Sequence, residues 1–333
     1  MASVVELFDD GNHRGSPELA NVQALSALAG SRTKRAREGL ATIVAIPAFN
    51  EEVAIGSIVL RLKKYADEVL VIDDGSQDRT AEVAKMASAT VISHPTNLGK
   101  GASIRDAFAY ARLANADILV LIDGDGQHNP DEVPALIKPI VDNEADIVNG
   151  SRFLTKRAHK IPLYRRIGQE VLSFATNSGI SQKITDSQNG FRAFSSRAFD
   201  CFSFRQTGMA IESEMLIDAS DARLKIKEVP INVRYDVPNA SSFNPISHGF
   251  GVLEKVLGLI SYRRPLTFFF LPGLGLMFLG DACALALFLI YNNTQTISVG
   301  FAIGTISFML LGIVFTTTGL LLQTLRKMIK SVN

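Results

Sequence analysis

The C-terminal part of the chain is almost free of charge. Between Arg264 and Arg326 the only charged side chain is Asp281, and a short polar loop separates two apolar stretches, 266–291 and 297–322. A helix of about 20 apolar residues is long enough to cross the hydrocarbon core of a bilayer. The sequence therefore predicts a hairpin of two transmembrane helices behind a water-soluble N-terminal part.

Basic residues lie on both sides of the predicted hairpin. Arg263 and Arg264 precede it, Arg326 and Lys327 follow it, and the connecting loop is uncharged. Such residues remain preferentially on the cytoplasmic side of a membrane. We therefore expect a multi-pass protein of the cell membrane with its soluble part and both termini in the cytoplasm. No apolar segment follows a basic N-terminal start, so we expect no signal peptide.

Overall composition argues against two classes of protein. The net charge is only +1 and the isoelectric point about 7.8, whereas a nucleic-acid-binding domain usually carries a strongly basic surface. We therefore expect no nucleic-acid partner. The two cysteines, Cys201 and Cys283, are too few for the disulfide framework of a small secreted protein.

From residue 41 onwards, apolar runs of strand length alternate with segments of helical periodicity. The predicted strands are 41–46, 68–72, 90–92, 117–122 and 146–148. The predicted helices are 52–65, 78–87, 100–113 and 130–143. Strands that are apolar almost throughout are typical of a sheet buried on both faces. The pattern predicts an α/β fold with a doubly wound, mainly parallel sheet.

Polar clusters follow the first four predicted strands. In an open parallel sheet, ligands bind beyond the carboxyl ends of the strands, so these clusters mark the expected site. They are Asn50-Glu51-Glu52, Asp73-Asp74-Gly75-Ser76, Asn97-Leu98-Gly99-Lys100-Gly101 and Asp123-Gly124-Asp125-Gly126-Gln127.

The last of these clusters predicts a metal site. Asp123 and Asp125 stand two residues apart between glycines, and Gln127 adds an amide oxygen. Such hard oxygen ligands suit Mg²⁺ or Mn²⁺. A cation held there would leave positions open for a substrate diphosphate and offset its charge. A pair of this kind is weak evidence alone, but the three preceding strand-end clusters strengthen it.

The set of motifs resembles family 2 glycosyltransferases, in particular the dolichyl-phosphate mannose synthase-like branch. The resemblance covers about residues 41–235. Besides the four clusters above, it rests on Pro47-Ala48-Phe49, Gly150-Ser151-Arg152, Asp186-Ser187-Gln188-Asn189-Gly190-Phe191-Arg192 and Glu228-Val229-Pro230. It implies a nucleotide-diphospho-sugar transferase (GT-A-like) fold.

The resemblance also implies roles for individual residues. Those expected to bind the donor nucleotide are Pro47, Phe49, Glu51, Asp74, Lys100 and Asp123. The metal ligands would be Asp123, Asp125 and Gln127, and the residues expected to act in catalysis are Asp125, Gln127 and Arg152. Phosphate and acceptor contacts are expected from Arg152, Arg165, Arg166, Asp186, Gln188, Arg192 and Glu214.

The implied reaction is an inverting transfer of a hexose from a nucleotide sugar to polyprenyl phosphate, such as dolichyl phosphate. Mannose synthases tend to carry a Gly-x-Ser-Lys element after the Glu-Val-Pro strand, and 234–245 lacks it. The donor therefore stays open between UDP-glucose, UDP-N-acetylglucosamine and GDP-mannose. The alternative function is a non-catalytic membrane protein that binds nucleotide sugars and regulates a partner enzyme.

These expectations divide the chain into five parts. They are a mobile or docking N-terminal extension (1–39), a catalytic domain (40–240), a juxtamembrane amphipathic helix (241–264), the hairpin (265–325) and a basic tail (326–333). Gly300 and Gly304 form a small-residue face that serves either the hairpin or a homo-oligomer. Asp281 is expensive within a membrane, so we expect it to make a helix–helix hydrogen bond or to line a lipid site.

Overall fold

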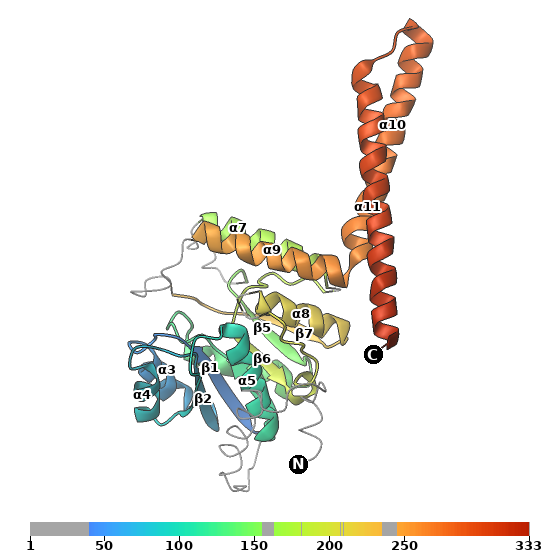
Figure 1. Cartoon of the computed structure of the whole chain (residues 1–333). Helices are drawn as coiled ribbons and strands as arrows, with labels where there is room; N and C mark the ends of the chain where they lie inside the picture. Colours follow the sequence, from blue (N-terminus) through green and yellow to red (C-terminus); the bar gives the residue numbers. More distant parts are fainter. Residues whose placement is uncertain are drawn as a thin grey trace. The chain divides into compact units, whose positions relative to one another are not determined.

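The computed structural model describes residues 40–154, 163–180, 182–206, 208, 210–234 and 245–332 (Figure 1). Side chains are described in these ranges except at 163–168, 245–252 and 329–332. The N-terminal extension, 1–39, lies outside the described residues. The chain forms two compact units: the first contains the described residues of 40–154 and 188–234, the second those of 163–187 and 245–332.

A seven-stranded sheet forms the centre of the first unit, with strand order β3-β2-β1-β4-β6-β5-β7. The strands are β1 (Thr42–Ala48), β2 (Glu68–Asp73), β3 (Thr90–Ser93), β4 (Ile118–Leu121), β5 (Ile147–Ser151), β6 (Arg192–Ser195) and β7 (Ile226–Pro230). All neighbouring strands are parallel except at β6, which runs antiparallel to both β4 and β5. The predicted mainly parallel sheet is confirmed. The apolar pattern indicated neither β6 nor β7, and only the resemblance pointed to the strand at Glu228-Val229-Pro230.

Alternating side chains of the strands fill two cores, one on each face of the sheet. In β1, Ile43 belongs to one core and Val44 to the other. This follows from the strand geometry, because successive side chains point to opposite faces. Each such side chain, once fully buried, contributes about 1.5–3 kcal/mol relative to exposure. Both faces are therefore closed to water, as the continuous apolar runs predict.

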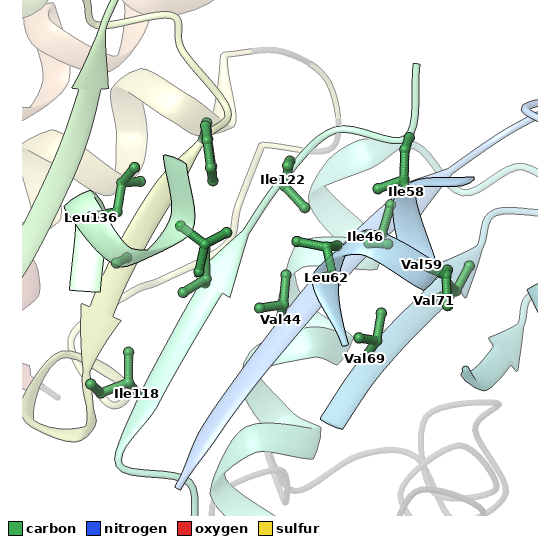
Figure 2. Close-up of a cluster of buried hydrophobic side chains, with 14 of the residues drawn as sticks. Val44, Ile46, Ile58, Val59, Leu62, Val69, Val71, Ile118, Ile122 and Leu136 are labelled. Carbon is green, nitrogen blue, oxygen red and sulfur yellow. The ribbon is translucent and has the colours of Figure 1, made fainter. Parts of the chain in front are cut away.

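Helices cover each face of the sheet. The core of Val44 is completed by α3 (Ile55–Leu62), α4 (Thr80–Met86) and α6 (Val133–Val141), which follows the short helix η1 (Pro130–Glu132) (Figure 2). The core of Ile43 is completed by α5 (Lys100–Leu113) and α8 (Ile211–Asp221). A further short helix, η3 (Ser196–Ala198), follows β6. The sheet is thus doubly wound, and its carboxyl-terminal rim is left for a site.

The second unit is helical. It contains α7 (Leu163–Ser178), α9 (Pro245–Arg263), the π-helical turn η4 (Leu266–Phe270), α10 (Leu271–Thr294) and α11 (Val299–Val332). Helix α7 packs against α9, which places residues 163–187 with the C-terminal helices rather than with the sheet. The segments Leu266–Thr294 and Val299–Met328 are long and apolar enough to cross a membrane. The expected pair of apolar helices is therefore present.

Glycines bring the backbones of α10 and α11 together. A Cβ atom built on Gly273 would lie 2.7 Å from the Thr316 nitrogen, and one built on Gly312 would lie 2.8 Å from the Gly273 carbonyl oxygen. Near the two ends of the contact, Gly280 meets Met309 and Gly319 meets Phe270 in the same way. Small residues allow this close approach between membrane helices.

Gly300 and Gly304, the two glycines of the predicted small-residue face, have different surroundings. A Cβ atom on Gly304 would lie 3.5 Å from the Cys283 sulfur of α10, so Gly304 faces the other helix of the hairpin. A Cβ atom on Gly300 would meet nothing within 4 Å. Asp281 is exposed on α10 rather than turned into the hairpin.

Candidate functional site

The loops after β1 and β2 are tied together at the rim. The Asn50 backbone donates a hydrogen bond to Ser76 Oγ (2.9 Å), and Asn50 Oδ1 accepts one from the Gln77 backbone (2.9 Å). The Glu51 backbone donates to Thr80 Oγ1 at 2.7 Å. Asn50 itself has a positive φ of 57°, which asparagine tolerates better than most residues. The two strand ends therefore form one continuous surface.

The Asp123-x-Asp125 turn follows β4 and contacts this surface. Gly126 adopts a φ of +72°, which turns the chain directly after the second carboxylate. Asp125 Oδ1 accepts a hydrogen bond from the Gln127 backbone at 2.9 Å. The Gln127 carbonyl oxygen accepts one from the Arg234 backbone at 2.9 Å, so the chain after β7 supports the turn from its other side.

A lysine and two carboxylates meet at the first aspartate. Lys100, the first residue of α5, places its Nζ atom 2.6 Å from Asp123 Oδ1 and 2.8 Å from Glu212 Oε1. His128 Nε2 lies 3.6 Å from the other oxygen of Asp123. Glu212, near the start of α8, is almost fully buried, and its Oε2 atom has no hydrogen-bond partner among the described residues. Three distant parts of the chain thus converge on one charged cluster.

Charge and burial set the protonation of these groups. Burial alone would lower the pKa of Lys100, but Asp123 and Glu212 outweigh it and raise that pKa above its ordinary value. Burial alone would raise the pKa of Asp123, but Lys100 and then His128 hold it well below its usual range. Burial, followed by the charge of Asp123, raises the pKa of Asp125. The cluster is therefore an ion pair beside a second carboxylate, that of Asp125, which ionises less readily than a carboxylate in water.

Glycine makes room for this ion pair. A Cβ atom built on Gly190 would lie 2.6 Å from Asp123 Oδ2 and 2.9 Å from Lys100 Nζ. Any larger residue would push the carboxylate or the ammonium group away. Gly190 belongs to the Asp186–Arg192 motif of the sequence, and the structure gives it a steric purpose.

The carboxylate pair fits a divalent cation. No group of three or more His, Cys, Asp or Glu side chains among the described residues could hold a metal by itself. Asp123 and Asp125 with the Gln127 amide oxygen would supply hard ligands. Burial and then the charge of Asp123 disfavour the ionised form of Asp125, and a bound cation would offset this penalty. Mg²⁺ commonly binds through one or two carboxylates and completes its shell with water and substrate phosphates.

Of the residues predicted to bind the nucleotide, Phe49 is exposed to solvent, whereas Asp74 is buried and already hydrogen-bonded within the protein. The Phe49 ring is 42% exposed directly after Pro47 and Ala48 of β1. The Asp74 carboxylate is buried and accepts hydrogen bonds from the backbones of Leu98 (2.9 Å) and Gly99 (2.8 Å). Its expected contact with the nucleoside remains a prediction, whereas its hold on the loop before Lys100 is visible.

Glu51 has an unusual acidity. Burial, followed by the charges of Asp125, Asp78 and Asp123, raises its pKa to about 7. Glu51 therefore lies within the electrostatic field of the predicted metal ligands.

Arg192 and Gln188 lie beneath the charged cluster. Arg192 is only 1% exposed, and its guanidinium donates to Asn149 Oδ1 (2.8 Å) and to the Glu212 carbonyl oxygen (2.8 Å). Gln188 Nε2 donates to Ser213 Oγ at 2.6 Å. Both residues thus position the start of α8, which carries Glu212. Their predicted contacts with phosphate or acceptor remain predictions.

The carboxylate of Glu214 already accepts hydrogen bonds from a neighbouring loop. Its carboxylate is fully buried and accepts hydrogen bonds from the backbones of Arg205 (3.2 Å) and Gln206 (2.8 Å). Ser203 Oγ also donates to it at 3.3 Å. These contacts make Glu214 an anchor for the 203–206 loop, and its predicted acceptor contact remains a prediction.

The remaining predicted site residues are three arginines and one aspartate. Arg152 is partly buried directly after β5. Arg165 and Arg166 lie on α7 of the second unit, and their side chains are outside the described residues. Asp186 is fully buried in the second unit.

Comparison with known proteins identifies the family. The family model described as "Glycosyl transferase family 2" matches residues 43–203. An uncharacterized protein of Methanocaldococcus jannaschii is 37% identical over 218 residues, 64% of this chain and 90% of that protein. A Methanococcus voltae protein, UDP-N-acetylglucosamine–dolichyl-phosphate N-acetylglucosaminyltransferase, is 33% identical over 235 residues, 64% of this chain and 94% of that protein. The chain belongs to glycosyltransferase family 2.

A solved structure matches the fold of this family 2 glycosyltransferase. It is glucosyl-3-phosphoglycerate synthase from Mycobacterium tuberculosis in complex with Mn²⁺ and UDP-glucose. The identity is 25%, the TM-score 0.52, and the match covers 76% of this chain and 84% of the other. The expected GT-A-like fold is therefore confirmed.

Sequence reasoning left three residues of this glycosyltransferase without an assigned place in the site. Glu212 was indistinguishable from a surface charge on a helix, because its partner Lys100 lies far away in the sequence. Gly190 stood inside a recognised motif but without a role. His128 follows Gln127 directly, and its ring also packs against Phe191 with centroids 5.2 Å apart. Proximity to the Asp-x-Asp motif was the one available signal for His128.

Proposed function

We propose that the protein transfers a sugar from a nucleotide diphospho-sugar to a polyprenyl phosphate such as dolichyl phosphate, with Mg²⁺ or Mn²⁺ as cofactor. The observation that carries this proposal is the Lys100–Asp123–Glu212 cluster beside Asp125 at the carboxyl-terminal rim of the sheet. The dolichyl-phosphate acceptor of the Methanococcus voltae relative supports the acceptor class. The Mn²⁺ and UDP-glucose complex of the Mycobacterium tuberculosis enzyme supports the donor and the metal.

The residues divide the work as follows in this proposal. Asp123, Asp125 and Gln127 would hold the cation, which when bound offsets the charge of the departing diphosphate. Lys100 keeps Asp123 ionised and oriented. The exposed Phe49 ring offers a flat apolar surface for a nucleobase.

Glu212 is the better candidate of two glutamates for a contact with the sugar. Its buried Oε2 atom has no hydrogen-bond partner among the described residues, so a sugar hydroxyl would satisfy it. Both oxygens of Glu214 already accept backbone hydrogen bonds. We therefore assign the sugar contact to Glu212.

The acceptor phosphate needs positioning more than a base. A phosphate monoester has a second pKa near 6 and is largely dianionic at pH 7. Orientation and charge stabilisation then carry most of the catalysis. The proposed reaction is a single displacement that inverts the anomeric centre, with Arg152 and the Arg165–Arg166 pair supplying phosphate contacts.

The two apolar helices explain how such an enzyme meets its acceptor. A long isoprenoid tail leaves the bilayer at a cost of about 0.8 kcal/mol per CH₂ group, so the enzyme has to work at the membrane surface. In the hairpin the Arg326 guanidinium donates to the Arg263 carbonyl oxygen, which brings both basic ends to the same end of the hairpin. This contact supports a topology with both ends in the cytoplasm.

The decisive experiment offers the purified protein labelled donors and measures label in organic-extractable lipid. The donors are UDP-glucose, UDP-N-acetylglucosamine and GDP-mannose, with dolichyl phosphate and either Mn²⁺, Mg²⁺ or EDTA. We expect transfer from one donor that EDTA abolishes, and no loss in the surface control Asp142→Asn. Nucleotide-sugar binding without transfer from any donor would favour the regulatory alternative instead.

Topology has its own measurement. A reporter fused after Asn333 should read as cytoplasmic. An extracytoplasmic signal would contradict the two-span arrangement.

A further inference from the structure

A second buried charge cluster lies behind the site. His94 follows β3 and is buried together with Asp74 and Asp106. Its Nδ1 atom lies 2.7 Å from Asp74 Oδ1, and its Nε2 atom lies 3.0 Å from Asp106 Oδ2. The ring is thus clamped between a carboxylate after β2 and a carboxylate of α5.

With both carboxylates ionised, this geometry requires a doubly protonated ring. An ionised carboxylate only accepts hydrogen bonds, and a neutral imidazole has a single N–H to donate. With a carboxylate at each nitrogen, both nitrogens donate only in the imidazolium form. Arg105 Nε lies 3.5 Å from the second oxygen of Asp106 and adds positive charge there.

His94, Asp74 and Asp106 together form a clamp. Its first carboxylate, that of Asp74, also holds the loop that precedes Lys100. Asp74 uses Oδ1 for His94 and for the Leu98 backbone, and Oδ2 for the Gly99 backbone. Gly99 has a φ of +92° and immediately precedes Lys100. Asp74 therefore holds the backbone N–H groups of the two residues immediately before the lysine that pairs with Asp123.

A steric contact locks the same loop from the other side. A Cβ atom built on Gly75 would lie 2.5 Å from the Thr96 carbonyl carbon and 2.7 Å from the Asn97 nitrogen. The backbone after β2 thus lies directly against the backbone of the 95–99 loop. The His94 backbone also donates to the Asp73 carbonyl oxygen at 2.9 Å.

We infer that His94 is a positioning residue of the transfer reaction: clamped by Asp74 and Asp106, it fixes the 95–99 loop and thereby the place of Lys100 against Asp123. The inference rests on the proposed function for its catalytic meaning and on the contacts above for its structural meaning. His94 touches neither substrate nor metal in this account. It acts through Asp74 and the two backbone N–H groups that Asp74 accepts.

The contacts of His94 with Asp74 and Asp106 depend on pH, because the protonated ring makes both of them. Burial alone would lower the pKa of His94, but the hydrogen bonds to Asp106 and Asp74 outweigh it and hold that pKa above its ordinary value. A raised folded-state pKa stabilises the fold fully below about pH 6.5, and this stability is lost as pH rises through the folded-state value. The charged groups placed against the ring or its partners are Asp74, Asp106 and Arg105.

Two substitutions separate the two ends of the clamp. His94→Asn keeps an amide nitrogen near the position of Nδ1 and is too short to reach Asp106. His94→Gln extends its amide toward Asp106 and removes the donor at Asp74. A matched control, Thr90→Val, removes the hydrogen bond to Glu68 Oε1 (2.6 Å) at the opposite end of the same strand.

Amide hydrogen exchange of the full-length protein without ligand tests the structural half. We expect the Leu98 and Gly99 amides to exchange at least about tenfold faster in His94→Gln, because a hydrogen bond to a charged group is lost. His94→Asn should restore most of the protection, and Thr90→Val should leave the two amides as in the wild type. Unchanged protection in His94→Gln would overturn the inference.

UDP binding in the presence of Mn²⁺, with GDP measured in parallel, tests the functional half. The dissociation constant should rise about tenfold in His94→Gln and stay near the wild-type value in Thr90→Val. Equal affinity in all variants would overturn the role of His94 while leaving the proposed function intact. A wild type that binds neither nucleotide would contradict the proposed function, and the exchange experiment would then decide the structural role alone.

The pH response provides a signature that a merely structural histidine would lack. The His94 ring can be titrated by NMR in the full-length protein, and Asp106→Asn removes one of the two carboxylates that stabilise its charge. We expect Asp106→Asn to lower the His94 titration midpoint and, with it, the pH at which the 95–99 loop loses protection. A midpoint that does not move would contradict the clamp.

Discussion

The two units of the molecule both use glycine to bring segments together, but for opposite purposes. In the sheet unit, Gly190 leaves room for an ion pair, that of Lys100 with Asp123. In the hairpin, Gly273 and Gly312 leave room for each other's backbone carbonyl groups. In a hairpin that spans a membrane, as we propose for this one, close packing has to replace the hydrophobic driving force, because lipid is as apolar as the side chains of the helices.

The units also treat charge differently. The sheet unit buries charged side chains together with partners of opposite charge, as at His94 with Asp74 and Asp106. The hairpin contains one charged side chain between its flanking arginines, Asp281, and exposes it. Removing one partner of a buried charge pair is strongly destabilising, because the other charge is left without compensation. We therefore expect substitutions in the charged site to disturb its geometry and activity, and substitutions in the hairpin to disturb helix packing.

The largest effect is expected at Asp125. Asp125→Asn removes a predicted metal ligand and also removes a carboxylate whose pKa is raised by burial and then by the charge of Asp123. Transfer to lipid should fall by more than about 100-fold, because even changes to the residues that support a metal ligand cost up to that much. The melting temperature should stay unchanged or rise. Radiolabel transfer and thermal unfolding measure the two quantities. Full activity in this variant would overturn the metal assignment.

A smaller loss is expected at Gly190. In Gly190→Ala, the new methyl group lies 2.6 Å from an Asp123 oxygen and forces the carboxylate to move. Mn²⁺ affinity in the presence of UDP should fall by about 10–100-fold, as when the support of a metal ligand is disturbed. Calorimetric titration of the metal measures this, and an unchanged affinity would show that the ion pair tolerates displacement.

The hairpin should respond in stability. Gly312→Leu places a large side chain where even a Cβ atom would lie 2.5 Å from Met277 Cγ. Overpacking of this kind costs about 1–3 kcal/mol. Gly300→Leu is the matched control, because nothing lies within 4 Å of a Cβ atom there. Unfolding in detergent should distinguish the two, and equal stability would contradict the observed helix contact.

The smallest effect is a change in pH dependence at Glu51. Its folded-state pKa is raised to about 7 from 4.5, so the folded protein binds more protons than the unfolded chain between these values. Stability should therefore fall as pH rises across that window. In EDTA, Glu51→Gln should melt about 2–4 °C higher than the wild type at pH 8 and equally at pH 4. A constant difference at both pH values would contradict this origin.

The sequence predicted what depends on local pattern. Alternating apolar runs indicated the strands, and the carboxyl ends of β1 to β4 did collect the polar clusters at one rim. The antiparallel strand β6 escaped because Arg192–Ser195 is short and begins with a buried arginine. Nothing in the local pattern distinguishes that arginine from one at the surface.

Contacts between distant residues could not be predicted in the same way. The pairing of Lys100 with Glu212 depends on how α8 lies against the sheet, and the sequence spacing carries no information about it. The Gly300-x-x-x-Gly304 motif did not show which glycine faces the other helix. That choice depends on the rotation of α11 about its axis, which a repeat of small residues leaves undetermined.

The length of the proposed transmembrane hairpin determines which bilayer it would fit. Its apolar segments contain 29 and 30 residues, which at 1.5 Å per residue is about 44 Å. The hydrocarbon core of a bilayer is only about 30 Å thick, but the bilayer with its headgroup layers measures about 40–45 Å. The helices therefore match the thickness of the whole bilayer. In the membrane-spanning arrangement that we propose, the Arg263–Arg326 contact at the base would lie at the depth of the lipid phosphates. Thin bilayers of short-chain lipids would tilt the helices or draw these arginines out of that layer.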